Sequence, residues 1–163
     1  MSGDNPRDIH SGGVSAWRLP PDRTCPSVAR ALTKRTLVTL GLQTGLVYDA
    51  VTAVSELSTN ALEHGLGITG PVTGSPTQHG CAPELWIYHR LHPESQIVLK
   101  IFDPRREWAR TGPPVKWLVA SESEHGRGLG VVGSLFGGWS AHLSRSRVSL
   151  WPLPGKAVLF SFP

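Results

Sequence analysis

The hydrophobic pattern of the chain opens with a weak alternation over residues 14–20, which stops at two prolines and predicts a short strand. Apolar residues then recur near helical spacing over residues 27–41. Thr24 or Ser27 can cap the start of this helix, and Gly41 can end it. We therefore expect a strand followed by a helix at the beginning of the chain.

A second helix is predicted from about Gly45 to His64, because the apolar residues of this stretch form one continuous stripe. Gly65 stands where a C-terminal cap belongs. The stripe would pack on the core of the protein, and it consists of Val47, Ala50, Val51, Val54, Leu57 and Ala61.

The second half of the chain has the pattern of strands. Two apolar runs, residues 84–91 and 96–103, are joined by the short turn HPES, which favours an antiparallel hairpin. The glycine-rich stretch 126–138 predicts a turn that opens a short helix. Residues 139–152 and 156–163 would add the closing strands.

This order of elements predicts an α+β two-layer sandwich, with a mixed, mostly antiparallel sheet covered on one face by about three helices. Residues 14–163 form a single domain in this interpretation, and residues 1–13, which are poor in apolar groups, form a disordered leader. The Gly- and Pro-rich stretches 65–83 and 104–125 are expected to be loops.

The composition narrows the class of protein. An apolar share of 39% and a charged share of 17% fit a soluble globular domain. No apolar run is long enough to span a bilayer and no secretory signal is recognisable, so we expect a cytoplasmic protein. Cys25 and Cys81 lie far apart without metal-ligand spacing, which argues against a structural zinc site. We expect both thiols to be reduced, although a single disulfide between them stays open.

The charge pattern allows an acidic partner. The net charge is +4, and no Lys or Arg lies between Arg35 and Arg90, so that the basic residues gather in the second half. They are scattered among predicted strands and loops, without an aromatic platform or a known binding motif. We therefore do not expect nucleic-acid binding.

A polar stripe lies on the second predicted helix, opposite its apolar stripe. The segment VSELSTNALEHG places Glu56, Asn60 and His64 four residues apart, within about 80° of the helix surface. Exposed helix faces usually mix both signs of charge, but no cation lies here. The stripe is either a solvated face or a ligand site. In a site, Asn60 would offer an oxygen to Mg²⁺, and Glu56 would orient or deprotonate a hydroxyl or water. For His64 we favour a role at the helix end over contact with a ligand: it would cap the helix or, when protonated, interact favourably with the helix dipole.

A glycine motif, EHGRGLG, precedes the third predicted helix. Gly126, Gly128 and Gly130 would leave backbone N–H groups bare at the helix start, where they attract phosphate. Arg127 adds a cation, and Leu129 begins the apolar periodicity of the helix. The alternative is a flexible turn with a helix cap.

Asp103 ends the apolar run IVLKIFD. Its carboxylate would accept a hydrogen bond from the exocyclic amine of adenine, or it starts a turn with Pro104. The residues alone leave both interpretations open.

Taken in chain order, these pieces resemble the GHKL (histidine-kinase-type) ATP-binding family. ELSTNALEHG resembles its N box, IFD the strand that carries its adenine-binding Asp, and GRGLG its glycine-rich lid box. The compact layout most resembles the standalone bacterial branch of anti-sigma-factor serine/threonine kinases, and PGKAVLFSF resembles the final strand of that branch. The resemblance covers roughly residues 14–162.

The resemblance implies ATP and Mg²⁺ as cofactors. It assigns Glu56 as the general base, Asn60 as the Mg²⁺ ligand and Asp103 as the adenine contact. It implies a sigma factor or an anti-anti-sigma-type antagonist as partner, with a Ser or Thr of the antagonist as phosphoryl acceptor, and a homodimer. The phosphates would be held by Gly126, Arg127, Gly128, Leu129 and Gly130.

One segment departs from the family. After its Asp the family commonly has DxGxG, whereas this chain reads DPRREW and has no glycine until Gly112. Pro104 fixes the backbone and removes a donor, which narrows the expected pocket. The alternative function is therefore a non-catalytic, sigma-factor-sequestering module with weak or no nucleotide binding. Trp108 or Trp117 would stack on the base or belong to the core.

Overall fold

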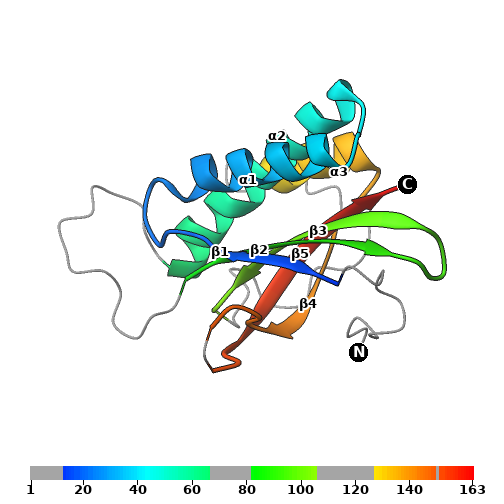
Figure 1. Cartoon of the computed structure of the whole chain (residues 1–163). Coiled ribbons are helices and arrows are strands. Elements are labelled where there is room, and N and C mark those ends of the chain that lie inside the picture. Colours follow the sequence, from blue (N-terminus) through cyan, green and yellow to red (C-terminus); the bar gives the residue numbers. More distant parts are fainter. Residues whose placement is uncertain (1–12, 67–81, 106–126, 150) are drawn as a thin grey trace.

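In the part of the chain that the structure describes, a five-stranded antiparallel sheet carries three helices on one face (Figure 1). The computed structural model describes residues 13–66, 82–105, 127–149 and 151–163. The strand order is β1-β2-β3-β5-β4, and all four pairings are antiparallel. The elements are β1 (Ser15–Arg18), α1 (Cys25–Thr39), α2 (Thr44–Asn60), the π-helical turn η2 (Ala61–Leu66), β2 (Glu84–Arg90), β3 (Gln96–Asp103), α3 (Arg127–Phe136), β4 (Ser140–Arg145) and β5 (Pro154–Phe162).

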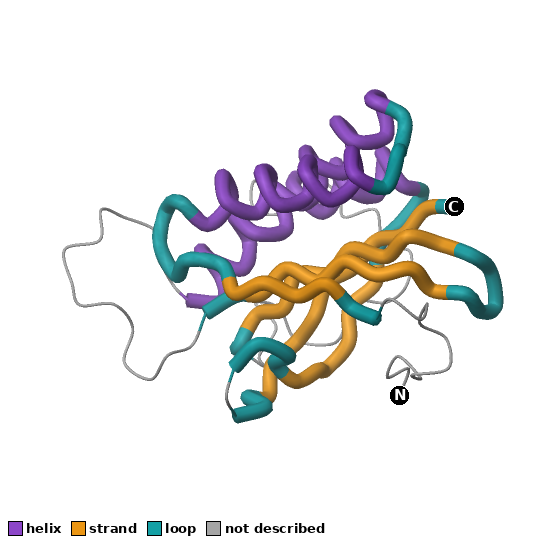
Figure 2. Tube along the Cα trace, in the orientation of Figure 1, coloured by secondary structure: helices purple, strands orange, loops and turns teal. Residues whose placement is uncertain are grey.

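The predicted fold class, an α+β two-layer sandwich, is confirmed. Figure 2 shows the helical layer above the strand layer in the same orientation. The predicted hairpin is the antiparallel pair β2–β3, whose register places Leu85 opposite Ile101 and Ile87 opposite Leu99. The sheet is more regular than expected, because the pairings among the described strands are all antiparallel rather than mixed.

Helix α1 begins and ends largely as its sequence predicts. Pro26 lies in its first turn, where a missing N–H has no helical partner to lose. Thr24 precedes the helix, but its side chain makes no capping hydrogen bond; its backbone N–H donates to Asp22 instead, at 2.7 Å. Gly41 follows the helix with φ 78°, a left-handed conformation that glycine adopts without strain.

Helix α2 ends differently from the prediction. The α-helix stops at Asn60 and widens into η2, so Gly65 lies inside the helical segment, and the prediction that it caps the helix was wrong. The hydroxyls of Ser58 and Thr59 donate to carbonyls of the preceding turn, at 2.7 and 2.9 Å. Such bonds compete with the backbone N–H groups and loosen the helix locally.

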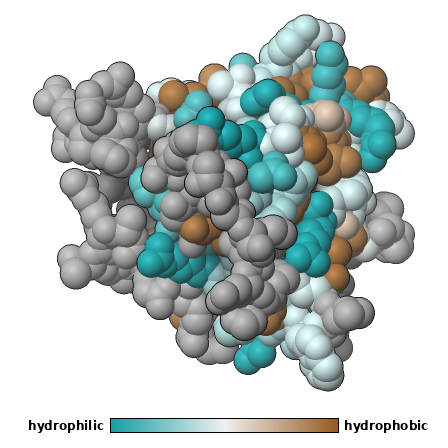
Figure 3. Space-filling view, turned by 90° about the vertical axis from the view of Figure 1, so that its left-hand side faces the viewer, coloured by the Kyte–Doolittle hydropathy of each residue, from teal (hydrophilic) through white to brown (hydrophobic). Residues whose placement is uncertain are grey.

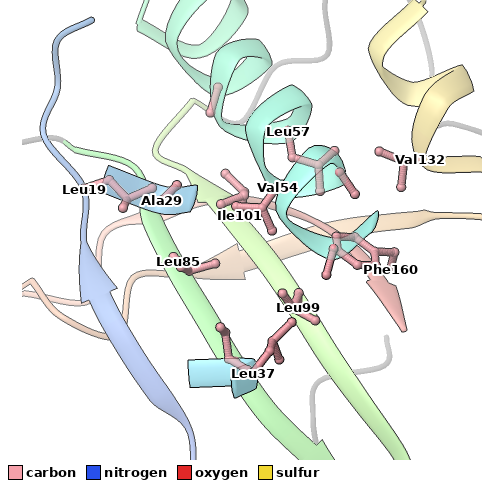
Figure 4. Close-up of a cluster of buried hydrophobic side chains, with 14 of the residues drawn as sticks. Leu19, Ala29, Leu37, Val54, Leu57, Leu85, Leu99, Ile101, Val132 and Phe160 are labelled. Atoms are coloured by element: carbon pink, nitrogen blue, oxygen red, sulfur yellow. The ribbon is translucent and has the colours of Figure 1, made fainter. Parts of the chain in front are cut away.

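The hydrophobic core lies between the two layers (Figure 4). Side chains alternate along each strand, so Leu85 and Leu99 face the helices while Trp86 and Phe102 face the other side of the sheet, where their rings stack 5.6 Å apart. The core joins all three helices to the sheet, and it includes Leu19, Ala29, Leu37, Val54, Leu57, Leu85, Leu99, Ile101, Val132 and Phe160.

Several sequence predictions fall outside the described residues. They concern Cys81, Trp108, Trp117, Gly126, residues 1–12 of the leader and most of the two loops. Cys25 is a free, buried thiol. In the part of the chain that the structure describes, no helix combines the length and the apolar character that crossing a membrane requires.

Candidate functional site

The contact between α2 and the first turn of α3 brings two of the sequence motifs together. Glu56 and Asn60 are half-buried on α2, and α3 packs against this helix. A Cβ atom placed on Gly128 would lie 2.7 Å from Oε2 of Glu56 and 3.3 Å from Nδ2 of Asn60. The polar stripe is therefore not an open solvated face, because the backbone of α3 lies directly against it.

The position of α3 is fixed from its other end. Phe136 stacks on Phe160 of β5 with ring centroids 4.4 Å apart, and Val132 is fully buried in the core. These contacts hold α3 on the sheet, so that its first turn lies against Glu56 and Asn60. A bulkier residue than glycine at position 128 would push the two helices apart or displace the Glu56 carboxylate.

Gly128 and Gly130 of the glycine motif lie inside the helix rather than before it, since α3 begins at Arg127. Gly128 and Gly130 are in its first turn, where backbone N–H groups have no partner within the helix. The positive end of the helix dipole stabilises the neighbouring carboxylate of Glu56 and would equally attract a phosphate. The predicted phosphate donors thus lie beside the predicted Mg²⁺ ligand and general base.

The remaining predicted residues of this motif contribute in different ways. A Cβ atom on Gly130 would meet nothing within 4 Å, so this position borders open space. The side chain of Leu129 packs against the core. Gly126 lies outside the described residues, and so does the side chain of Arg127.

His64 belongs to η2, beyond the end of α2, where it is half-buried. Its backbone carbonyl accepts a hydrogen bond from the guanidinium of Arg105, at 3.1 Å. A residue from the end of the sheet thus supplies a donor to the last helical turn, where the sequence had suggested that His64 itself would cap the helix.

Asp103 ends β3 as predicted, but its carboxylate is already engaged. Oδ2 lies 2.8 Å from Nζ of Lys156 on β5, and Oδ1 accepts a hydrogen bond from the backbone N–H of Arg105, at 2.8 Å. Burial raises the pKa of the Asp103 carboxyl above its ordinary value, and this effect outweighs the lowering of the pKa by Lys156 and Arg105. Asp103 is thus a buried ion-paired residue, and not an open acceptor at the end of a strand.

Sequence reasoning missed Lys156. Its signal was a lysine inside the apolar closing strand KAVLFSF, where a cation needs a partner. The partner could not be read from the pattern, because β3 and β5 are not consecutive and their register pairs Asp103 with Lys156 across the sheet.

Among the described residues, no group of three or more His, Cys, Asp or Glu side chains is arranged to hold a metal ion. The oxygen ligand that the sequence predicts for Mg²⁺ is the single amide of Asn60. A cation there would need further oxygens from a bound phosphate chain.

The comparisons with known proteins bear on the fold. No protein-family model matches this chain, and no curated protein sequence matches it. Its structure is similar to the crystal structure of the RsbU and RsbW domains of Rv1364c from Mycobacterium tuberculosis, with a TM-score of 0.51 and 16% sequence identity. The similarity covers 91% of this chain and 31% of that chain. At this identity it shows a shared fold.

Proposed function

We propose that the protein is a regulatory kinase of the anti-sigma-factor type. It binds a Mg²⁺–nucleoside triphosphate between α2 and α3 and transfers the terminal phosphoryl group to a Ser or Thr of an antagonist protein. The observation that carries the proposal is the close approach of Gly128 to Glu56 and Asn60, which joins two motifs that are far apart in the sequence. The likeness of the fold to a structure that includes an RsbW domain supports the same class.

The roles follow from the chemistry of each group. Asn60 would offer its amide oxygen to Mg²⁺, and the first turn of α3 would donate backbone N–H groups to phosphate oxygens. Glu56 would take the proton of the acceptor hydroxyl. Mg²⁺, when bound with the nucleotide, supplies neutralisation of the phosphate charge.

The residues fit the phosphate end of a nucleotide better than its base. The first turn of α3 presents backbone N–H groups beside Asn60, and position 130 borders open space, whereas the carboxylate of Asp103 is buried and paired with Lys156. ATP is the nucleotide that the family resemblance implies, and its phosphate chain is the part that these residues would hold.

A calorimetric titration with ATP, with and without Mg²⁺, tests the site. We expect Mg²⁺-dependent binding to the wild type and a loss of at least about tenfold in affinity for Asn60→Ala, since one metal ligand is removed. Thr52→Ala, an exposed substitution on the same helix, is the control and should bind as the wild type does. If the wild type binds no ATP under either condition, the proposed nucleotide site is wrong.

Phosphoryl transfer tests the role of Glu56. With a partner protein in hand, Glu56→Gln should lower the transfer rate about 100-fold or more while leaving nucleotide binding intact, because general-base catalysis is worth this much. Glu63→Gln, on the exposed side of η2, should transfer at the wild-type rate. If Glu56→Gln lost nucleotide binding as well as phosphoryl transfer, the assignment of Glu56 as the base would be wrong.

A second candidate function is a non-catalytic module that sequesters a sigma factor or a similar partner. The ion pair between Asp103 and Lys156 favours it, because it occupies the carboxylate that the family resemblance assigns to adenine. A partner that binds equally well with and without nucleotide and is never phosphorylated would favour this function over the kinase.

A further inference from the structure

At the end of β3, Asp103, Arg105 and Lys156 bind one another through polar contacts, and we call this cluster the polar corner. Asp103 and Lys156 are paired in the register of β3 and β5, and their charged atoms lie 2.8 Å apart. Nζ of Lys156 also donates to the backbone carbonyl of Arg105, at 2.9 Å, while the N–H of Arg105 donates to Asp103. Each oxygen of the Asp103 carboxylate therefore already accepts from the protein itself.

Because both charged side chains are buried, a ligand cannot easily replace Lys156 as the partner of the Asp103 carboxylate. The side chains of Lys156 and Asp103 are 9% and 5% exposed, so water reaches neither group freely. A ligand N–H that displaced Lys156 from the carboxylate would leave an ammonium ion buried beside it without its counter-charge. Removing one partner of a buried pair is far more costly than the gain from one neutral hydrogen bond.

The backbone builds the corner, because β5 approaches β3 closely at Gly155. A Cβ atom at this position would clash with the carbonyl of Asp103 and lie 2.6 Å from the ring of Phe102. The absence of a side chain brings the next residue, Lys156, level with Asp103. Arg105 extends the corner to the carbonyl of His64, and η2 itself packs against β3.

We propose that Lys156 makes the nucleotide site indifferent to the base. The inference rests on the proposed function: α2 and α3 hold the phosphates, and Lys156 withholds Asp103 from the exocyclic amine of adenine. The ligand class is then the Mg²⁺ complex of any nucleoside triphosphate that the site admits, and the phosphate chain supplies the recognition.

ATP and ITP separate this inference from the proposed function, since they differ at position 6 of the base, where ATP has an amine and ITP a carbonyl. Titrations with Mg²⁺ and ATP, ITP or inorganic tripolyphosphate should give the wild type equal affinities for ATP and ITP, within about threefold. In Lys156→Met the carboxylate is released, so ATP should bind at least about tenfold more tightly than ITP, because the amine donates to Asp103 and the carbonyl oxygen is repelled by it.

Two further variants complete the test. Lys34→Met removes an exposed lysine of α1 and should leave the wild-type ratio unchanged, which controls for net charge. Lys156→Gln also removes the cation opposite Asp103 but keeps a polar side chain at this buried position. It should prefer ATP over ITP as Lys156→Met does, and it decides the role of Lys156 in the same way if Lys156→Met does not fold.

The outcomes are distinct. A wild type that prefers ATP over ITP by more than tenfold overturns the inference and leaves the proposed function standing. Equal affinities in both the wild type and Lys156→Met overturn the role of Lys156. Absence of binding to all three phosphate compounds overturns the proposed function, and the inference falls with it.

Discussion

A glycine in the first turn of a helix is unfavourable by up to about 1 kcal/mol relative to alanine, so Gly128 needs a reason in its surroundings. The reason is the 2.7 Å that would separate an added Cβ from Oε2 of Glu56. Gly133→Ala, further along α3 where the added Cβ has ordinary contacts, should raise the free energy of unfolding by about 0.5–1 kcal/mol. Gly128→Ala should gain less, because the Glu56 carboxylate has to move.

The two variants should differ more in binding than in stability. Gly128→Ala displaces the Glu56 carboxylate and shifts the first turn of α3 relative to Asn60. We therefore expect it to lower the affinity for Mg²⁺–ATP at least about tenfold, since the groups that would hold the phosphates no longer lie in place. Urea unfolding and calorimetric titration of the same preparations check both quantities. Equal affinities of Gly128→Ala and Gly133→Ala would show that the α2–α3 contact is structural.

Cys25 provides a prediction that does not depend on the nucleotide site. Burial raises the pKa of its thiol to about 12, and the charge of Asp22 adds to the effect. At pH 8 the thiolate fraction is then about 1,000-fold lower than for a thiol of ordinary pKa, and it rises tenfold with each pH unit until the pKa is reached.

Alkylation by iodoacetamide measures this shift. In a Cys81→Ser variant, Cys25 should react at pH 8 at least about 1,000-fold more slowly than in urea-unfolded protein. A new thiol at an exposed position of α1, Ala31→Cys in a Cys25→Ser, Cys81→Ser background, should react at the ordinary rate without urea. Rapid labelling of native Cys25 would mean that the start of α1 opens often.

At the scale of elements, the approach of β5 to β3 depends on one glycine. Gly155→Ala would drive a methyl group into the carbonyl of Asp103 and the ring of Phe102, neither of which can move without separating the strands. We expect a loss of about 3 kcal/mol in the free energy of unfolding. Gly45→Ala, in the first turn of α2 with nothing within 4 Å of the added Cβ, should gain up to about 1 kcal/mol. Thermal unfolding of the pair compares them, and equal melting temperatures would contradict the close approach.

The elements differ in how far the sequence predicts them. The end of β3 at Asp103 could be predicted, because an apolar run stops there. The strand expected over residues 139–152 is shorter, since β4 ends at Arg145. The buried carboxylate of Glu84 accepts a hydrogen bond from the backbone N–H of Arg147, at 2.8 Å, and holds this turn. A contact between residues so far apart leaves no trace in hydrophobic periodicity.

The candidate site also contains residues that local spacing predicts and residues that only long-range contacts bring together. Glu56 and Asn60 could be predicted to share a face, because helical spacing alone places them one turn apart. That Gly128 belongs to the same site was implied by the family resemblance alone, and its contact with Glu56 and Asn60 was not predicted. Lys156 escaped prediction, because its role depends on the register between two strands that do not follow each other in the chain.

At the scale of the whole molecule, the contact of Gly128 with Glu56 and Asn60 lies where α2 and α3 meet above the sheet. Its residues come from both halves of the chain. Hydrophilic and hydrophobic residues are interspersed over the described part of the face in Figure 3. Unfolding separates α2 from α3 and destroys the contact between them at Gly128. A ligand that binds between them therefore binds the folded state alone and has to stabilise the entire fold.

This linkage gives a prediction for the whole molecule. At a free concentration of 100 times its dissociation constant, Mg²⁺–ATP should add about 2.7 kcal/mol to the free energy of unfolding. For a domain of this size, that corresponds to a rise of roughly 5–10 °C in melting temperature. Differential scanning fluorimetry with increasing Mg²⁺–ATP should show the rise in the wild type and in Gly133→Ala. In Gly128→Ala, whose affinity is at least about tenfold lower, the rise should be at most about half as large. An equal rise in all three would place the nucleotide elsewhere on the fold, whereas a rise that needs no Mg²⁺ would remove the metal from the site and keep the phosphate contacts of α3.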